Sequence, residues 1–179
     1  QLTSILTNAL WPELTMLQAQ GQADTMRRVH LLSVKVITLM SLMAAIFLQH
    51  CGADVFTLWT QGSLGYDAEL MRAFLIVLVV QTPWMTSMFV LIASNNHHRL
   101  SALWFAASLI GLALGALLLP TYGPAGLVYG LGIAELALCG FTVPRLSCKL
   151  IGQRYGEFIT RVLFGGALFC LCNAMVVDA

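Results

Sequence analysis

The stretch GLVYGLGIAELALCGFTV, residues Gly126–Val143, decides the fold class. It carries one charged side chain, Glu135, close to its middle, and most of its other side chains are apolar. A helix needs about 20 mostly apolar residues to cross the hydrocarbon core of a bilayer, and this run lacks the period-two alternation of a barrel strand. The stretch therefore predicts a membrane-spanning helix that holds a carboxylate inside the membrane.

The composition of the whole chain leads to the same class. Of the 179 residues, 59% are hydrophobic and 9% are charged, and the mean hydropathy is +0.83, whereas a soluble domain has about 25% charged residues. The formal net charge of +1 does not indicate a nucleic-acid partner. The chain starts at Gln1 without a basic segment before its first apolar run, so we expect a piece of a longer membrane protein.

Six apolar runs are candidates for membrane-spanning helices. The first, Gln1–Trp11, is truncated. The five full runs are Leu31–Gln49, Ala73–Ala93, Leu100–Leu119, Leu127–Val143 and Val162–Val177. Because these runs are continuous, the predicted fold is all-α, a polytopic transmembrane helix bundle.

The basic residues predict an orientation. Cytoplasmic loops of membrane proteins carry an excess of lysine and arginine. If the runs cross the membrane in turn, eight of the nine basic residues share one side, and Arg72 is the ninth; the eight are Arg27, Arg28, Lys35, Arg99, Arg145, Lys149, Arg154 and Arg161. We expect that side to be cytoplasmic in a multi-pass protein of the cell inner membrane, with the Cys51–Arg72 loop and the Pro120–Gly126 turn outside.

The polar segment between the first two runs, Pro12–His30, has two interpretations. Scattered apolar residues fit a short amphipathic helix that lies at the inner interface, with Arg27 and Arg28 near phospholipid head groups. A solvated connector fits equally well.

Glu135 is the main candidate for a transport or coupling residue. A charge at the centre of a membrane helix costs about 2.5–3.5 kcal/mol on insertion scales, so such a carboxylate faces the bundle interior or a water-filled cavity, or is protonated. It would then couple transport to a proton or cation, or contact the substrate. The alternative, equally weighted, is a carboxyl that hydrogen-bonds to a neighbouring helix and only specifies packing.

Three further residues are candidates with weaker signals. Pro83 interrupts the backbone hydrogen bonding of a membrane run and is a candidate hinge, although such kinks also occur without a site nearby. Gln81, two residues earlier and close to Trp84, would line the same cavity or bond to another helix. Lys35 lies near the inner end of its run, where snorkelling to the interface is favoured; in a cavity it would suit an anionic phosphate.

The remaining motifs indicate packing and not chemistry. Gly111 with Gly115, and Gly126 with Gly130 backed by Gly132, have the spacing that lets membrane helices approach closely. The adjacent His97 and His98 lack the partners of a metal site, and the cysteines lack disulfide or zinc spacing. No catalytic or nucleotide-binding signature is present. We expect no enzyme activity, no cofactor and no metal.

Three local patterns resemble one superfamily. ALWPELTMLQAQGQ (Ala9–Gln22), FTLWTQGSLGYDAELMRAFL (Phe56–Leu75) and LLLPTYGPAGLVYGLGIAE (Leu117–Glu135) are similar, in order and sidedness, to segments of the C-terminal repeat of the multidrug/oligosaccharidyl-lipid/polysaccharide exporters. Within that superfamily the chain resembles most the O-antigen and capsular-polysaccharide flippases.

The resemblance implies a secondary transporter of 12 to 14 helices in two six-helix bundles, which flips a polyprenyl-pyrophosphate-linked oligosaccharide to the outer leaflet by alternating access. Residues 1–145 would form most of the second bundle, and residues 146–179 an inner loop and one additional helix. Expected partners are the lipid bilayer, the polyprenyl-linked glycan, H+ or Na+ as coupling ion, and the missing N-terminal half. The alternatives are a cation-coupled multidrug antiporter of the same superfamily, and a non-transporting scaffold or glycan-pathway membrane enzyme.

Overall fold

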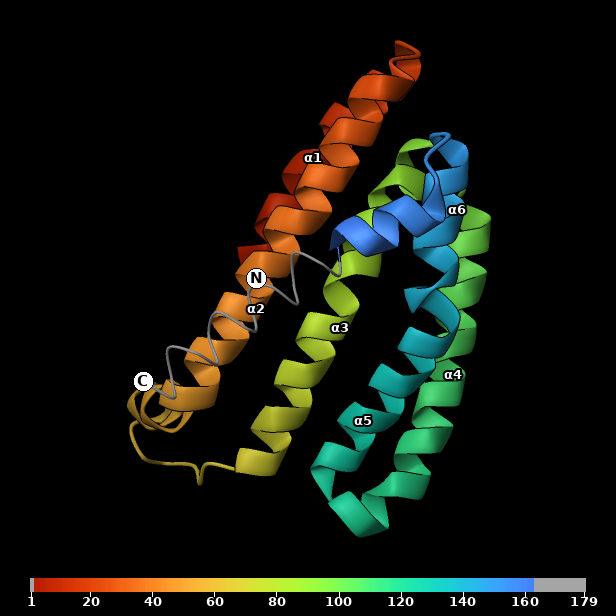
Figure 1. Ribbon diagram of the computed structural model, residues 1–179. Coiled ribbons are helices and arrows are strands. Elements are labelled where there is room, and N and C mark those ends of the chain that lie inside the picture. The colour runs from red at the N-terminus through yellow and green to blue at the C-terminus, as the bar shows by residue number, and fades with distance from the viewer. Residues whose placement is uncertain (1, 163–179) are drawn as a thin grey trace.

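The computed structural model describes the backbone of residues 2–162 and the side chains of residues 10–162. The chain is helical throughout this range, apart from short turns (Figure 1). The elements are α1 (Leu2–Ala19), α2 (Ala23–Thr60), α3 (Ala68–Ala93), α4 (His97–Tyr122), α5 (Pro124–Glu135), a π-helical turn η1 (Leu136–Gly140) and α6 (Thr142–Leu150). The predicted last span, Val162–Val177, lies outside the described residues except for its first.

Four helices of the described range are long and apolar enough to cross a membrane. They are α2, α3, α4 and the continuous run Pro124–Leu150, which joins α5, η1 and α6. The predicted all-α fold is therefore confirmed for the described part of the chain, and four of its helices have the length and apolar composition that crossing a membrane requires. The run α5–η1–α6 also passes through Arg145, where sequence analysis divides the chain into two domains.

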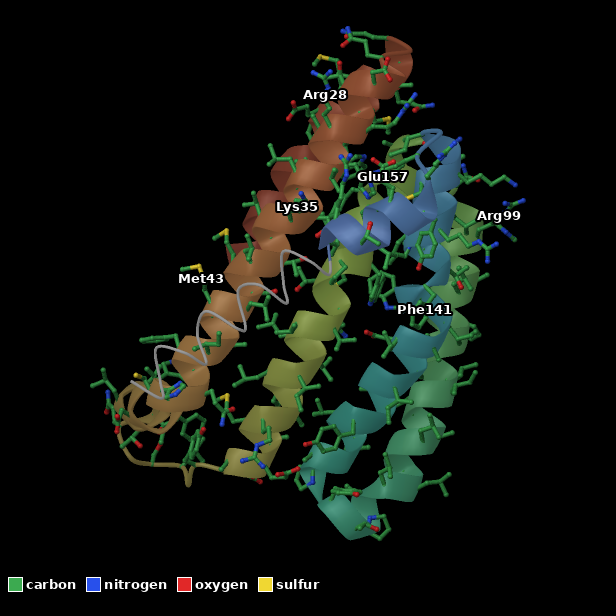
Figure 2. The ribbon with its side chains drawn as sticks, viewed as in Figure 1. Arg28, Lys35, Met43, Arg99, Phe141 and Glu157 are labelled. Atoms are coloured by element: carbon green, nitrogen blue, oxygen red, sulfur yellow. The ribbon has the colours of Figure 1, made fainter. Side chains whose placement is uncertain are left out.

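The helices form a row in which α3 lies between two antiparallel pairs, α1 with α2 and α4 with α5 (Figure 1). The α1–α2 turn, the α3–α4 turn and α6 lie at one end, and the α2–α3 loop and the α4–α5 turn lie at the other. Arg28 and Arg99 accordingly lie towards the same end of the molecule (Figure 2). This arrangement is the one that the predicted orientation requires.

Pro12–His30 forms neither a separate short helix at the interface nor a solvated connector. Residues up to Ala19 continue α1, and α2 begins at Ala23 after a turn at Gly21, whose φ of 67° is left-handed. Three of its apolar residues are buried in a core cluster with the C-terminal end of α3; this cluster consists of Leu14, Leu17, Met26, Phe89, Val90 and Ile151. The segment is thus a helical hairpin packed into the bundle.

The loop between α2 and α3 is shorter than the predicted Cys51–Arg72. Helix α2 continues to Thr60 and α3 begins at Ala68, so only residues 61–67 form the connection. Gln61 ends α2 in a left-handed conformation with a φ of 52°, and the Asp67 side chain accepts a hydrogen bond of 3.0 Å from the Leu70 backbone N–H at the start of α3. A side-chain acceptor at this position satisfies one of the free N–H groups of the first turn.

The predicted glycine packing is confirmed, and it joins α4 to α5. A Cβ placed on Gly126 would lie 2.6 Å from the Leu118 carbonyl carbon, and one on Gly130 would lie 2.5 Å from the Gly115 Cα. No side chain fits at such distances, so the two backbones touch. Close backbone approach replaces the hydrophobic driving force that lipid does not supply.

Candidate functional site

The structure brings two of the predicted site residues together. Gln81 lies in the middle of α3, and Glu135 is the last residue of α5. The Gln81 Nε2 donates a hydrogen bond to the Glu135 Oε2, and both side chains are half-buried. This is the inter-helix contact that the packing alternative requires, and it places a carboxylate and a carboxamide side by side between two helices that are long and apolar enough to cross a membrane.

Two tryptophans extend this pair towards α4. Trp104 of α4 lies near the Glu135 carboxyl. Its ring lies edge to face with Trp84 of α3, with ring centroids 6.1 Å apart. Trp84 is buried, and its indole Nε1 has no hydrogen-bond partner within the described residues. Three helices therefore contribute polar groups to one position in the bundle, which we call the Glu135 site: Gln81, Trp84, Trp104 and Glu135.

A change of helix type begins directly after Glu135. Residues Leu136–Gly140 form a π-helical turn, and Cys139 within it is buried in the same core cluster as Trp84. Single π-helical turns inside α-helices occur frequently at functional sites, because the wider turn alters the backbone hydrogen bonds and re-aims the side chains. The sequence contains no proline here and offers no signal for this turn.

Pro83 lies within α3, which continues from Ala68 to Ala93. Hydroxyl groups bond to backbone carbonyls around it: Thr82 donates to the Leu78 carbonyl at 2.7 Å, and Ser87 donates to the Pro83 carbonyl at 2.8 Å. Side-chain hydroxyls commonly re-satisfy backbone groups near a proline in a membrane helix. Because α3 is continuous in this state, hinge motion at Pro83 stays a prediction.

Lys35 does not join the Glu135 site. It is half-buried on α2, and α3 lies between α2 and α5 (Figures 1 and 2). Among the residues with described side chains, Lys35 forms no ion pair. The three predicted transport residues are therefore one pair and one separate lysine.

Sequence analysis missed a buried polar cluster built around His30, at the end of the bundle that holds the α1–α2 turn. The His30 side chain is only 1% exposed; its Nε2 lies 3.0 Å from the Ser87 Oγ, and its Nδ1 lies 3.3 Å from the Gln153 Oε1. The ring stacks on Phe158, with centroids 5.1 Å apart. The cluster joins α2 and α3 to the segment after α6. Its members lie up to 128 positions from His30 in the sequence, so no local pattern reveals them.

The chain matches no model of a known protein family, no curated protein and no solved structure. The resemblance to the exporters accordingly stays a prediction.

Proposed function

We propose that this chain is part of a secondary transporter that moves a polyprenyl-pyrophosphate-linked oligosaccharide, an O-antigen or capsular unit, from the cytoplasmic to the outer leaflet. The observation that carries the proposal is the Gln81–Glu135 hydrogen bond between two membrane-spanning helices. Ionisable residues inside a membrane are costly and mark substrate or ion pathways. The three sequence patterns that resemble the polysaccharide flippases supply the cargo class.

The pair has the chemistry of a coupling site. A glutamine side chain contains both N–H donors and a carbonyl acceptor. The Gln81 carboxamide can therefore donate to an ionised Glu135 and, after its amide group turns over, accept from a protonated one. Both protonation states keep a partner, so a proton can bind and leave without stranding an unpaired polar group in the bundle. A sodium ion bound by the two side-chain oxygens would use the same pair.

Residues 1–145 would form most of the second six-helix bundle of this transporter, in the cell inner membrane. The pyrophosphate of the cargo requires cationic side chains, and the Glu135 site contains none. We expect the N-terminal half of the same chain to supply most of them. Glu135 is then an ion site and not a cargo contact.

The sidedness of lipid-linked glycan in cells tests this function. Cells would carry the intact full-length protein, a deletion, Glu135→Gln, or the matched control Glu13→Gln, which changes an exposed carboxylate. We expect the deletion and Glu135→Gln to leave the glycan on the cytoplasmic leaflet, and Glu13→Gln to behave as the intact protein. Normal crossing in the deletion strain would refute the flippase proposal.

One observation favours a second function, cation-coupled multidrug antiport. A carboxylate beside Trp84 and Trp104 could hold an organic cation by charge and by cation–π attraction. This function predicts that the deletion raises the accumulation of ethidium in cells while glycan sidedness stays normal.

A further inference from the structure

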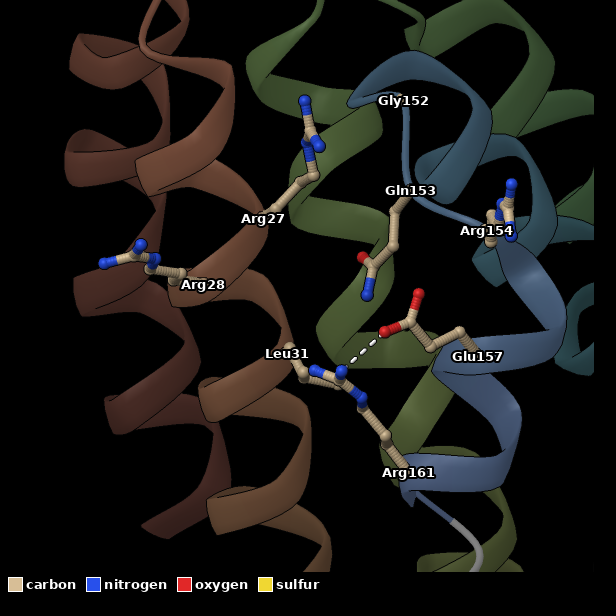
Figure 3. Close-up of a pocket in the computed structure, with 8 residues that line it drawn as sticks. All are labelled: Arg27, Arg28, Leu31, Gly152, Gln153, Arg154, Glu157 and Arg161. Atoms are coloured by element: carbon tan, nitrogen blue, oxygen red, sulfur yellow. Dashed lines mark ion pairs between the residues drawn. The ribbon is translucent and has the colours of Figure 1, made fainter.

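A second concentration of charge lies at the inner end of the bundle, away from the Glu135 site. A cavity of about 330 Å³ separates the first turns of α2 from the segment that follows α6 (Figure 3). We call it the arginine cleft; it is lined by Arg27, Arg28, Leu31, Gly152, Gln153, Arg154, Glu157 and Arg161. Four of these side chains are cationic and one is anionic.

The carboxylates near the cleft do not neutralise it. Arg161 pairs with Glu157 at 2.5 Å, and Arg27 pairs with Asp24 at 3.2 Å. Arg28 and Arg154, at the rim, form no ion pair within the described part of the chain. The cleft therefore holds an excess of positive charge in a small volume, and an anion bound there would relieve the repulsion among the guanidinium groups.

Arg27 brings a hydrogen-bond donor without a partner into the cleft. Arg27 extends from α2 towards the turn at Gly152, and its Nε is buried without a hydrogen-bond partner among the described residues (Figure 3). Gly152 has a φ of 66°, which an L side chain rarely adopts. A buried donor without a partner costs about 1–3 kcal/mol, so a ligand that accepts this hydrogen bond would gain from it.

The walls of the cleft are fixed by the buried core beneath them. Gln153 is held by His30, whose ring stacks on Phe158. Phe158 is itself buried in a cluster with Val34 and Cys148. These contacts join the segment after α6 to α2 and so hold the two arginine-bearing walls together. Ligand binding therefore does not have to bring the walls together.

We propose that the arginine cleft binds the phosphate group of an anionic lipid in the cytoplasmic leaflet. Guanidinium groups donate parallel hydrogen bonds that match phosphate oxygens, and basic pockets between membrane helices on the cytoplasmic side bind lipid head groups. The position favours a lipid over free phosphate: Leu31 lines the cleft, and the neighbouring Leu32 and Val36 on α2 are 63% and 44% exposed. Acyl chains would lie along these residues.

This site goes beyond the proposed function, because it would hold a lipid whether or not the protein carries a glycan. Binding is measured on the full-length protein in detergent, by native mass spectrometry and by the thermal unfolding midpoint. The probes are dioleoyl phosphatidylglycerol, dioleoyl phosphatidylcholine, which has the same chains without net charge, and inorganic phosphate. We expect phosphatidylglycerol to bind at least about tenfold more tightly than phosphatidylcholine. We also expect it to raise the thermal unfolding midpoint, whereas inorganic phosphate should not.

Two double variants locate the site. Arg27→Gln with Arg161→Gln removes the two cleft arginines that pair with carboxylates, and should lower the affinity for phosphatidylglycerol at least about tenfold. Since this variant also frees two carboxylates and can weaken the fold, Arg28→Gln with Arg154→Gln provides a second measurement at the rim, with a smaller loss in the same direction.

The matched control is Arg99→Gln with Arg145→Gln, two exposed arginines on the same side and outside the cleft. The proposal is overturned if this control loses as much affinity as the cleft variants, or if the two lipids bind equally. Stabilisation by inorganic phosphate equal to that by phosphatidylglycerol would overturn the assignment to a lipid.

Discussion

The Gln81 side chain of α3 donates a hydrogen bond to the Glu135 carboxylate of α5, across 54 positions of sequence. The bond joins α3 to the α4–α5 pair at the end of α5, where the π-helical turn begins. The bond therefore gives the Glu135 carboxylate a polar partner inside the bundle.

Replacing Gln81 by leucine removes the donor and leaves the Glu135 carboxyl without this partner. We expect the variant to be less stable by about 1–3 kcal/mol, the cost of a buried polar group left unsatisfied. Thermal unfolding of the full-length protein in detergent measures this, with Gln49→Leu, an exposed glutamine of α2, as the control. Equal stability of the two variants would mean that the hydrogen bond contributes nothing.

Replacing Gly130 by alanine should separate α4 from α5. The added Cβ would lie 2.5 Å from the Gly115 Cα, so the helices must shift, at an expected cost of about 1–3 kcal/mol. Gly65→Ala is the matched control, because nothing lies within 4 Å of its Cβ position. If both variants unfold at the same temperature as the unchanged protein, the two helices do not touch as described.

Replacing His30 by alanine should loosen the segment after α6. The change removes the stack on Phe158 and the contacts to Ser87 and Gln153, with an expected cost of about 1–3 kcal/mol. Cys148, which is fully buried, reports the effect when it is the only cysteine left in the full-length protein. We expect maleimide to label Cys148 in the His30→Ala variant and not in the unchanged protein; His50→Ala, an exposed histidine, should leave it protected.

The orientation is tested by labelling from outside the cell. In a cysteine-free background, Ser63→Cys lies in the connection between α2 and α3, and His98→Cys lies in the first turn of α4 at the other end of the bundle. A membrane-impermeant maleimide should label Ser63→Cys in intact cells and His98→Cys only after permeabilisation. The reverse pattern would invert the predicted sidedness.

The sequence predicts the helices well because the bilayer constrains them strongly. An apolar run of the right length has few alternatives to a spanning helix, so Ala73–Ala93 and Leu100–Leu119 fall inside α3 and α4. The prediction is wrong where that constraint ends. Apolar residues of the hairpin, such as Leu14 and Met26, fit a surface helix by spacing, but Phe89 and Val90 of α3 cover them.

The sequence predicts Gln81 and Glu135 as individual candidates, but it does not predict that they are in contact. Gln81 and Glu135 each stand out because a polar side chain in an apolar run is expensive. Their contact depends on how α3 packs against α5, and the sequence of neither helix determines this. The same limit applies to His30, whose partners Ser87 and Gln153 lie on other elements, and to Lys35, which lies on a helix that α3 separates from α5.

The most direct test of the Glu135 site as a coupling site is transport by the purified full-length protein in proteoliposomes. Flipping of a polyprenyl-pyrophosphate-linked glycan is measured with and without an imposed H+ or Na+ gradient, for the unchanged protein, Glu135→Gln and Glu13→Gln. We predict that a gradient of one ion accelerates flipping by the unchanged protein and by Glu13→Gln, and that Glu135→Gln loses this acceleration while it still binds the glycan. Gradient-driven flipping by Glu135→Gln at the rate of the unchanged protein would contradict the account.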